Sequence, residues 1–267
     1  MSAAGIGIAA VALSMLPITV QPAFSQDSAA APSKLGLQQN QPLQGQVHHE
    51  EKLPPIAPQY NVGNTLDPSE LTALTPNNRW FQIPDWFAGK WHSDEQTILF
   101  LHEYATGMTI NRPTPMKEVS DVTYGRQKDK TGRIWQFIKV PQTQKEEVSR
   151  GIAYLTSSAE DVIQVDGSKI VLTMRYESIT VNNKNKIIDV KQIETINTYT
   201  PLDDGLIKLT ASMKSFDAEG NPQVLQTGEK LLTNTAPYQT MDKDGDLDLK
   251  SMFVEFLKKT DQADLVP

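Results

Sequence analysis

The feature that most constrains the fold is a long series of β-type segments with no helical pattern between them. From residue 95 to residue 234, runs rich in β-branched and aromatic residues alternate with turn signals such as Asp-Gly. Consecutive strands joined by short turns pair antiparallel, so the sequence predicts an all-β meander of about nine strands. We place them at residues 95–104, 118–126, 133–140, 150–156, 160–166, 168–181, 187–199, 206–216 and 224–234.

Alternation of apolar and polar residues indicates that each strand has one wet face. In residues 168–181, Leu172, Met174 and Tyr176 share one side, and charged residues occupy the other. A long meander leaves two exposed edges unless it closes on itself. We therefore expect an antiparallel up-and-down β-barrel of about eight or nine strands.

Two helical patterns flank the strands. Residues 67–76 predict a short helix that begins near Pro68 and ends at Pro76. The stretch "LKSMFVEFLKK" follows Asp248 and carries an apolar stripe at helical spacing. We expect this C-terminal helix to be capped by Asp248 and to pack outside the barrel.

The N-terminal residues predict export. Residues 1–25 contain no charged side chain, hold an apolar run, and end with small residues at A-x-A-like spacing. This pattern is typical of a cleaved secretory signal peptide. An uncleaved membrane anchor is the alternative, but Ser14 and Pro17 interrupt the run. The expected location is the periplasm, a thylakoid lumen or the extracellular medium, without a stable membrane span after cleavage.

Residues 26–66 are rich in Gln, Pro and Ala and show no sustained periodicity. Such a composition buries too little apolar surface to offset its ordering entropy, so we expect a disordered linker. The predicted domain organisation is a signal peptide at 1–25, a linker at 26–66, and a barrel domain with its C-terminal helix at 67–260.

Composition excludes several function classes. The net charge is −7 and there is no basic cluster, which argues against nucleic acid as a partner. The chain has no cysteine, which excludes disulfides, thiolate metal sites and cysteine nucleophiles. Common catalytic and nucleotide-binding motifs are absent, and no histidine follows His102. We therefore predict a protein that is not an enzyme and carries no cofactor.

An acidic turn is the one motif that resembles a metal site. Asp242, Asp244 and Asp246 match the first ligand positions of an EF-hand calcium loop. The turn glycine of that loop is replaced by Leu247 and its bidentate glutamate by Phe253. We therefore favour a turn that leads into the Asp248 cap, with calcium binding as the weaker alternative.

An aromatic cluster precedes the first long strand, in the stretch "DWFAGKWHSD". Gly89 favours a tight turn, and Trp86 and Trp91 supply apolar area that can close an open barrel end. The order of short helix, G-x-W turn, serial strands and C-terminal helix resembles the lipocalins and the wider calycin superfamily. The resemblance covers roughly residues 79–260 and implies a barrel closed at one end, with Gly89, Trp91 and Trp86 as closure residues.

The preferred function is an exported binding protein for a small hydrophobic or amphipathic ligand, because barrels of this size hold one such molecule. The same wall residues would also suit a packed core. The alternative is a non-enzymatic interaction or assembly factor of an exported complex, using the N-terminal arm and the barrel surface. The candidate wall residues are Trp135, Phe137, Leu172, Met174, Tyr176, Leu209 and Met213.

Overall fold

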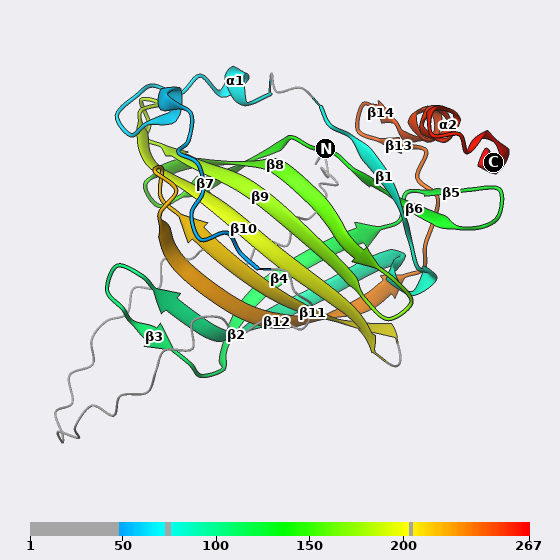
Figure 1. Ribbon diagram of the computed structural model, residues 1–267, viewed down its shortest axis with the longest axis horizontal. Coiled ribbons are helices and arrows are strands. Elements are labelled where there is room, and N and C mark those ends of the chain that lie inside the picture. The colour runs from blue at the N-terminus through cyan, green and yellow to red at the C-terminus, as the bar shows by residue number, and fades with distance from the viewer. Residues whose placement is uncertain (1–47, 73–75, 203–204) are drawn as a thin grey trace.

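The computed structural model describes residues 48–72, 76–202 and 205–267, and its main feature is a large antiparallel sheet (Figure 1). The strands of this sheet are β2 (Gly89–Glu103), β3 (Thr109–Ile110), β4 (Thr114–Tyr124), β7 (Gln142–Val148), β8 (Gly151–Val165), β9 (Ile170–Val181), β10 (Ile187–Leu202), β11 (Leu206–Phe216) and β12 (Pro222–Ala236). The expected signal peptide and residues 26–47 of the expected linker lie outside the described residues.

Smaller elements lie around the large sheet. A second sheet contains β1 (Arg79–Ile83), β5 (Gln127–Lys128) and β6 (Ile134–Ile138), and a hairpin contains β13 (Lys243–Asp244) and β14 (Leu247–Asp248). The α-helices are α1 (Pro68–Thr72) and α2 (Leu249–Lys259), and the single-turn helices are η1 (Pro58–Tyr60), η2 (Asp85–Phe87) and η4 (Ala263–Leu265). None of the described helices is long and apolar enough to span a membrane.

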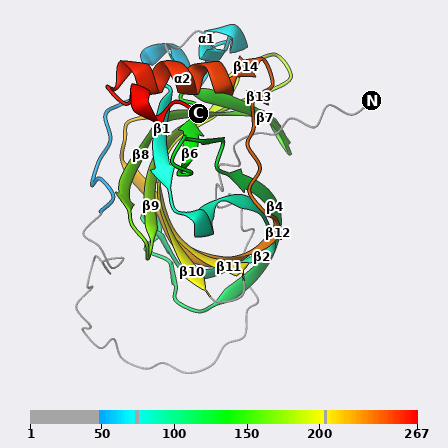
Figure 2. The same cartoon turned by 90° about the vertical axis from the view of Figure 1, so that its right-hand side faces the viewer.

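The large sheet is strongly curved but is not a closed barrel. Its strand order is β3-β2-β12-β11-β10-β9-β8-β7, with β4 also paired to β2. The first long strand therefore pairs with the last, as a barrel requires. In the described part of the chain, however, no ladder joins β4 to β7, and the sheet forms a trough (Figure 2).

The break in the predicted meander arises at residues 133–140. This segment was expected to continue the barrel, but β6 pairs with β1 and β5 in the second sheet. The chain leaves β4 through Gly125, where φ is +86° and an added Cβ would lie 2.9 Å from atoms of Ile134 and Tyr238. A glycine is needed here because a side chain would collide with both neighbours.

The strand prediction is otherwise close to the structure. The expected strands 168–181, 187–199, 206–216 and 224–234 correspond to β9, β10, β11 and β12. The segments 150–156 and 160–166 form one strand, β8, because a bulge between Ser157 and Ala159 lets it continue. Strands β1 and β7 were not predicted, since their sequences lack a clear apolar alternation.

Residues 48–66 are packed against the sheet and are not a free linker. The amide of Leu53 donates to the carbonyl of Gly220 at 3.0 Å, and that of Ile56 donates to Ala218 at 2.9 Å. The side chains of Leu53, Ile56 and Leu66 are buried. The composition of residues 26–66 suggested that ordering entropy would keep the segment disordered. In residues 48–66 the apolar contacts with the sheet offset that entropy.

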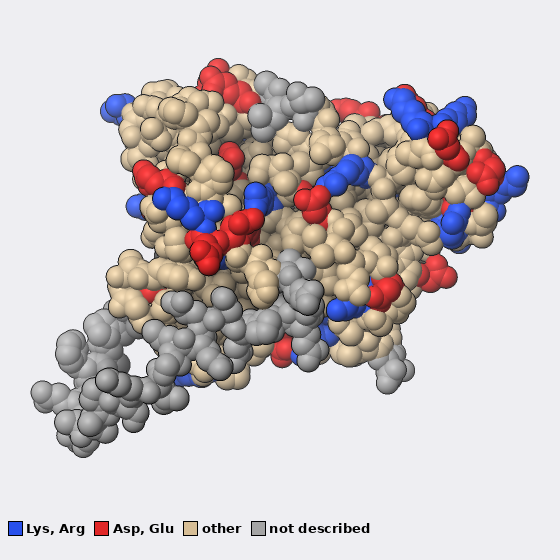
Figure 3. Space-filling view, in the orientation of Figure 1, with Lys and Arg blue, Asp and Glu red and all other residues tan. Residues whose placement is uncertain are grey.

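The start of this segment is held by charges on the convex face of the sheet. The amide of Glu50 donates to Glu194 Oε2 at 2.9 Å, and Lys214 Nζ donates to the carbonyl of Glu50 at 2.7 Å. Arg175 Nη2 lies 2.7 Å from Glu194 Oε1. Acidic and basic side chains lie side by side on this face (Figure 3). The described part of the arm is thus bound to its own sheet.

Helix α2 buries its predicted apolar stripe, but it packs on the second sheet and not on the wall of a barrel. Leu249, Phe253 and Leu257 are fully buried in a cluster with Trp80, Trp135 and Phe137. Asp248 caps the helix, since its Oδ1 accepts from the amide of Ser251 at 2.9 Å. The expected cap and packing face are both confirmed.

The cap provides a test of this part of the fold. We expect Asp248→Ala to lower the urea midpoint of unfolding, because the amide of Ser251 loses its acceptor and the helix loses a negative charge at its positive end. Asp246→Ala is the matched control, because Asp246 is exposed in the same turn and its substitution removes the same charge. Equal midpoints for the two variants would contradict the assigned cap.

Candidate functional site

One end of the concave face is closed by aromatic side chains. Trp91 is 3% exposed and its Nε1 donates to the carbonyl of Phe87 at 3.0 Å. Phe87 stacks on Tyr124 with ring centroids 3.9 Å apart, and the hydroxyl of Tyr124 donates to that of Tyr199 at 3.0 Å. This last bond joins β4 to β10 across the trough.

The turn before Trp91 requires glycine. Gly89 has φ of +138°, and an added Cβ would lie 2.8 Å from the carbonyl oxygen of Ala236. Trp86 is only partly buried, and its Nε1 donates to the carbonyl of Gly167 at 3.1 Å. Gly89 and Trp91 thus lie within the closed end, and Trp86 lies at its margin.

The predicted wall residues separate into two groups. Leu172, Met174, Tyr176, Leu209 and Met213 lie together in the concave core cluster. Trp135 and Phe137 do not line this interior; they lie under α2, on the other side of the second sheet. The alternation of β6 could not show which side faces the trough, because both faces of this strand are buried.

A row of polar and methionine side chains crosses the middle of the concave face. Register places Glu160 of β8 opposite Met174 of β9, and Met174 opposite Thr195 of β10. The row continues through Met213 of β11 to Gln226 of β12. It interrupts the apolar surface along a line perpendicular to the strands. We call these five residues the polar row.

Several buried polar atoms in and beside the polar row have no hydrogen-bond partner. They include Thr195 Oγ1 and Gln226 Nε2 in the row, Asn197 Oδ1 beside it, and both amide atoms of Gln96 on β2. Native interiors leave few such atoms unpaired. The sequence carries a signal for these internal polar groups, because the apolar alternation assigns the positions of Thr195, Asn197 and Gln226 to the concave side.

A buried ion pair lies farther along the same face. Lys230 Nζ is 3.0 Å from Glu118 Oε1, and the two side chains are 1% and 14% exposed. The second carboxylate oxygen, Oε2 of Glu118, has no partner. Lys230 is the only basic residue of the expected strand 224–234, and its charge therefore lies inside the trough.

Glu160 faces a small cleft at the other end of the polar row. The cleft is bounded by Gln142 and Gln144 of β7, Leu155 and Glu160 of β8, and Lys139, and it encloses about 20 Å³. Burial raises the pKa of Glu160 to about 7, with the Arg79 charge acting in the opposite direction.

Two further polar features lie outside the trough. The first is His92 on the outer face of β2, where its Nδ1 lies 2.8 Å from Asp121 and its Nε2 3.0 Å from Asp94. Hydrogen bonds to these two carboxylates raise the pKa of His92. The exposed imidazole is thus an outer-face contact between β2 and β4.

The acidic turn forms the β13–β14 hairpin. Asp244 pairs with Leu247 in this hairpin, and Asp242 and Asp246 are exposed. Throughout the described ranges, no group of three or more histidine, aspartate or glutamate side chains is placed to hold a metal ion. The hairpin leads directly into α2 through its cap, Asp248.

Comparisons with known proteins add no family to these observations. The chain matches no protein-family model, no curated protein and no solved structure. The resemblance to the calycins therefore stays a prediction. What the concave face offers chemically is a set of unpaired hydrogen-bonding groups and the carboxyl groups of Glu118 and Glu160 between apolar walls.

Proposed function

We propose that the concave face of the large sheet binds a small amphipathic molecule. The single observation that carries this proposal is the set of unpaired buried polar atoms in and beside the polar row. Apolar residues of the core cluster, including Leu172 and Leu209, lie on either side of the row. A molecule with both apolar surface and hydrogen-bonding groups matches such a surface.

The energetic argument favours an amphipathic ligand over a purely hydrophobic one. Each buried donor or acceptor without a partner costs about 1–3 kcal/mol. Thr195, Asn197 and Gln226 would keep this cost beside a hydrocarbon, whereas a ligand with hydroxyl, amide or charged groups would remove it. Ordered water is the competing occupant, and the ligand must replace its hydrogen bonds.

In this proposal the protein is an exported, lipocalin-like carrier. Strand β12 pairs with β2, which supports a barrel-like order of strands. The gap between β4 and β7 is where the second sheet lies, so β1 and β6 would complete the wall by packing instead of by a ladder. The aromatic end at Trp91 would be the closed floor and the Glu160 cleft part of the wall.

A binding assay with one interior variant tests the proposal. We expect native mass spectrometry or titration calorimetry to detect binding of at least one of hexanol, hexanoate, hexylamine or their dodecyl homologues. Asn197→Leu is expected to weaken that binding by about tenfold, equivalent to about 1.4 kcal/mol. Thr198→Leu is the matched control, because its side chain points to the convex face.

Two results would contradict the proposal. One is the failure of every probe to bind to the folded wild-type protein. The other is equal weakening by Asn197→Leu and Thr198→Leu, which would place the ligand elsewhere. Recovery of a protein partner in place of a small molecule would then favour the assembly-factor alternative.

A further inference from the structure

Glu160 is a buried carboxyl group that shares its cleft with the ring of Tyr176. Glu160 is 8% exposed, and it contributes electrostatically to the raised pKa values of Tyr124, Tyr176 and Tyr199. Of these tyrosines, Tyr176 of β9 lines the cleft together with Glu160, whereas Tyr124 and Tyr199 lie at the aromatic closed end of the trough. Burial raises the pKa of Tyr199 to about 12, so the ring stays neutral. Neutral aromatic rings beside a carboxylate favour a cation.

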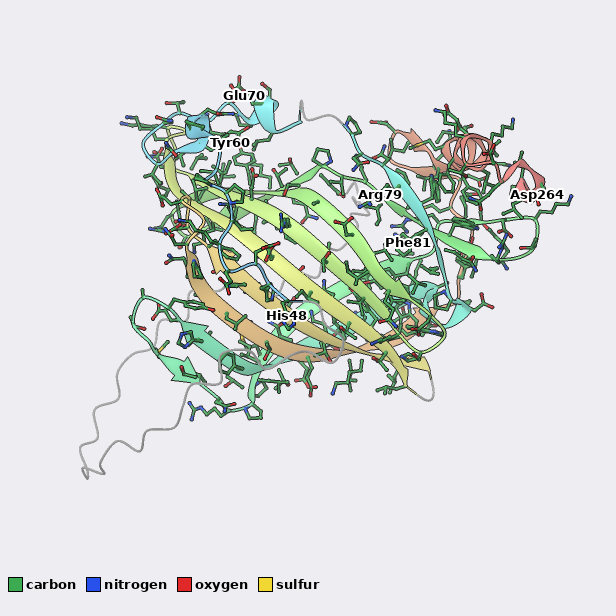
Figure 4. All side chains as sticks on the ribbon, in the orientation of Figure 1. His48, Tyr60, Glu70, Arg79, Phe81 and Asp264 are labelled. Atoms are coloured by element: carbon green, nitrogen blue, oxygen red, sulfur yellow. The ribbon has the colours of Figure 1, made fainter. Side chains whose placement is uncertain are left out.

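The nearby basic side chains Arg79 and Lys139 form no side-chain ion pair with this carboxyl group. Arg79 lies on β1 (Figure 4). It donates from Nη2 to the backbone carbonyl of Glu160 and to Asp161 Oδ1, the latter at 2.9 Å. Lys139 is exposed at the rim of the cleft and forms no ion pair with Glu160. The neighbouring Asp161 is 58% exposed and is already paired with Arg79, so the Glu160 carboxyl group is the one left to bind a cation from outside the protein.

The size of the cleft limits what can bind. An enclosed volume of about 20 Å³ has room for one water-sized group. A primary ammonium group is of this size, whereas a trimethylammonium group is several times larger. Leu155 and Met174 also line the cleft and can contact an alkyl chain beside the charged group.

We propose that the cleft at Glu160 binds the primary ammonium group of an aliphatic amine. The ammonium donates to the Glu160 carboxylate, and the ring of Tyr176 in the same cleft stabilises its charge. This assignment rests on the proposed function, since the alkyl part of the amine would lie along the concave face. It narrows the ligand from any amphipathic molecule to a primary amine.

Binding should depend on pH in a defined direction. The pKa of Glu160 is about 7, so the carboxyl group is mostly neutral at about pH 6 and mostly ionised at about pH 8. An alkylamine stays protonated over this range. Amine binding should therefore tighten by about tenfold from pH 6 to pH 8, as the ionised fraction rises by that factor. Arg79, Asp161 and Lys139 are the charged neighbours; the tyrosines do not titrate here.

The test measures binding to the full-length protein of four probes that share a six-carbon alkyl chain. The probes are hexylamine, hexanol, hexanoate and hexyltrimethylammonium. We expect hexylamine to bind at least about tenfold more tightly than the other three at pH 8, and Glu160→Gln to remove that preference. Asp161→Asn is the matched control, because it removes an adjacent exposed carboxylate and should keep the preference.

The outcomes separate this inference from the proposed function. If hexanol or hexanoate binds in an Asn197-dependent manner but hexylamine has no advantage, ligand binding holds and the ammonium assignment is wrong. If no probe binds, both proposals fail. Should Glu160→Gln not fold, the wild-type protein still decides, because equal binding of hexylamine and hexyltrimethylammonium, or a flat pH profile, overturns the assignment.

Discussion

Replacing Trp91 with alanine is expected to reduce the free energy of unfolding by ~3–5 kcal/mol. The indole is 3% exposed and lies in the core cluster with Phe87, Val122 and Tyr124. Its removal leaves a cavity at the closed end of the trough and frees the carbonyl of Phe87, which accepts its Nε1 hydrogen bond. Urea unfolding followed by circular dichroism measures the loss without relying on tryptophan fluorescence.

Trp86→Ala is the control for this prediction. It removes the same side chain five positions earlier, but Trp86 is only partly buried and its hydrogen bond is at the exposed margin. We expect a loss well below that of Trp91→Ala, because less apolar area returns to water. Similar losses for the two variants would show that Trp91 does not form the packed end of the trough.

Replacing Lys230 with methionine is expected to reduce the free energy of unfolding by roughly 3–5 kcal/mol, because a buried Glu118 loses its counter-charge. The two side chains are 1% and 14% exposed, and the ion pair is 3.0 Å long. The double variant Lys230→Met with Glu118→Leu should recover much of this loss, since it removes both charges. A double-mutant cycle in urea measures the coupling.

The surface pair Lys208–Glu229 provides the matched control. These residues lie on β11 and β12 and are 2.6 Å apart, but their side chains are 42% and 36% exposed. Solvent screening makes such pairs worth about 0–1 kcal/mol, so Lys208→Met should cost little. If Lys230→Met costs no more than Lys208→Met, or if the double variant is the least stable, the internal ion pair is wrongly assigned.

Much of the fold follows from local patterns in the chain. The period-two alternation of 168–181 and 206–216 predicted strands that match β9 and β11 within two residues at each end. Asp248 and the apolar stripe after it predicted α2, its cap and its buried face. These features depend on residues that are close together in the chain, so they can be predicted from the sequence alone.

The candidate site was predicted only in part. Side-chain alternation correctly grouped the wall residues of β9 and β11, but it placed Trp135 and Phe137 in the same wall. A strand buried on both faces gives no periodic signal, so β6 could not be oriented from its sequence. The polar row escaped notice because its members are far apart in the chain and meet only through the register of β8 to β12.

The amino-acid sequence alone therefore determined the all-β class, most strand positions, the glycine turn at Gly89 and the capped C-terminal helix. Tertiary structure decided that the sheet stays open between β4 and β7, that residues 48–66 bind its convex face, and that Glu160, Thr195 and Gln226 share one row. The physical reason is the range of the interactions. Propensity, capping and alternation act within a few residues, whereas sheet closure and side-chain convergence depend on pairing between distant strands, where several partners are locally acceptable.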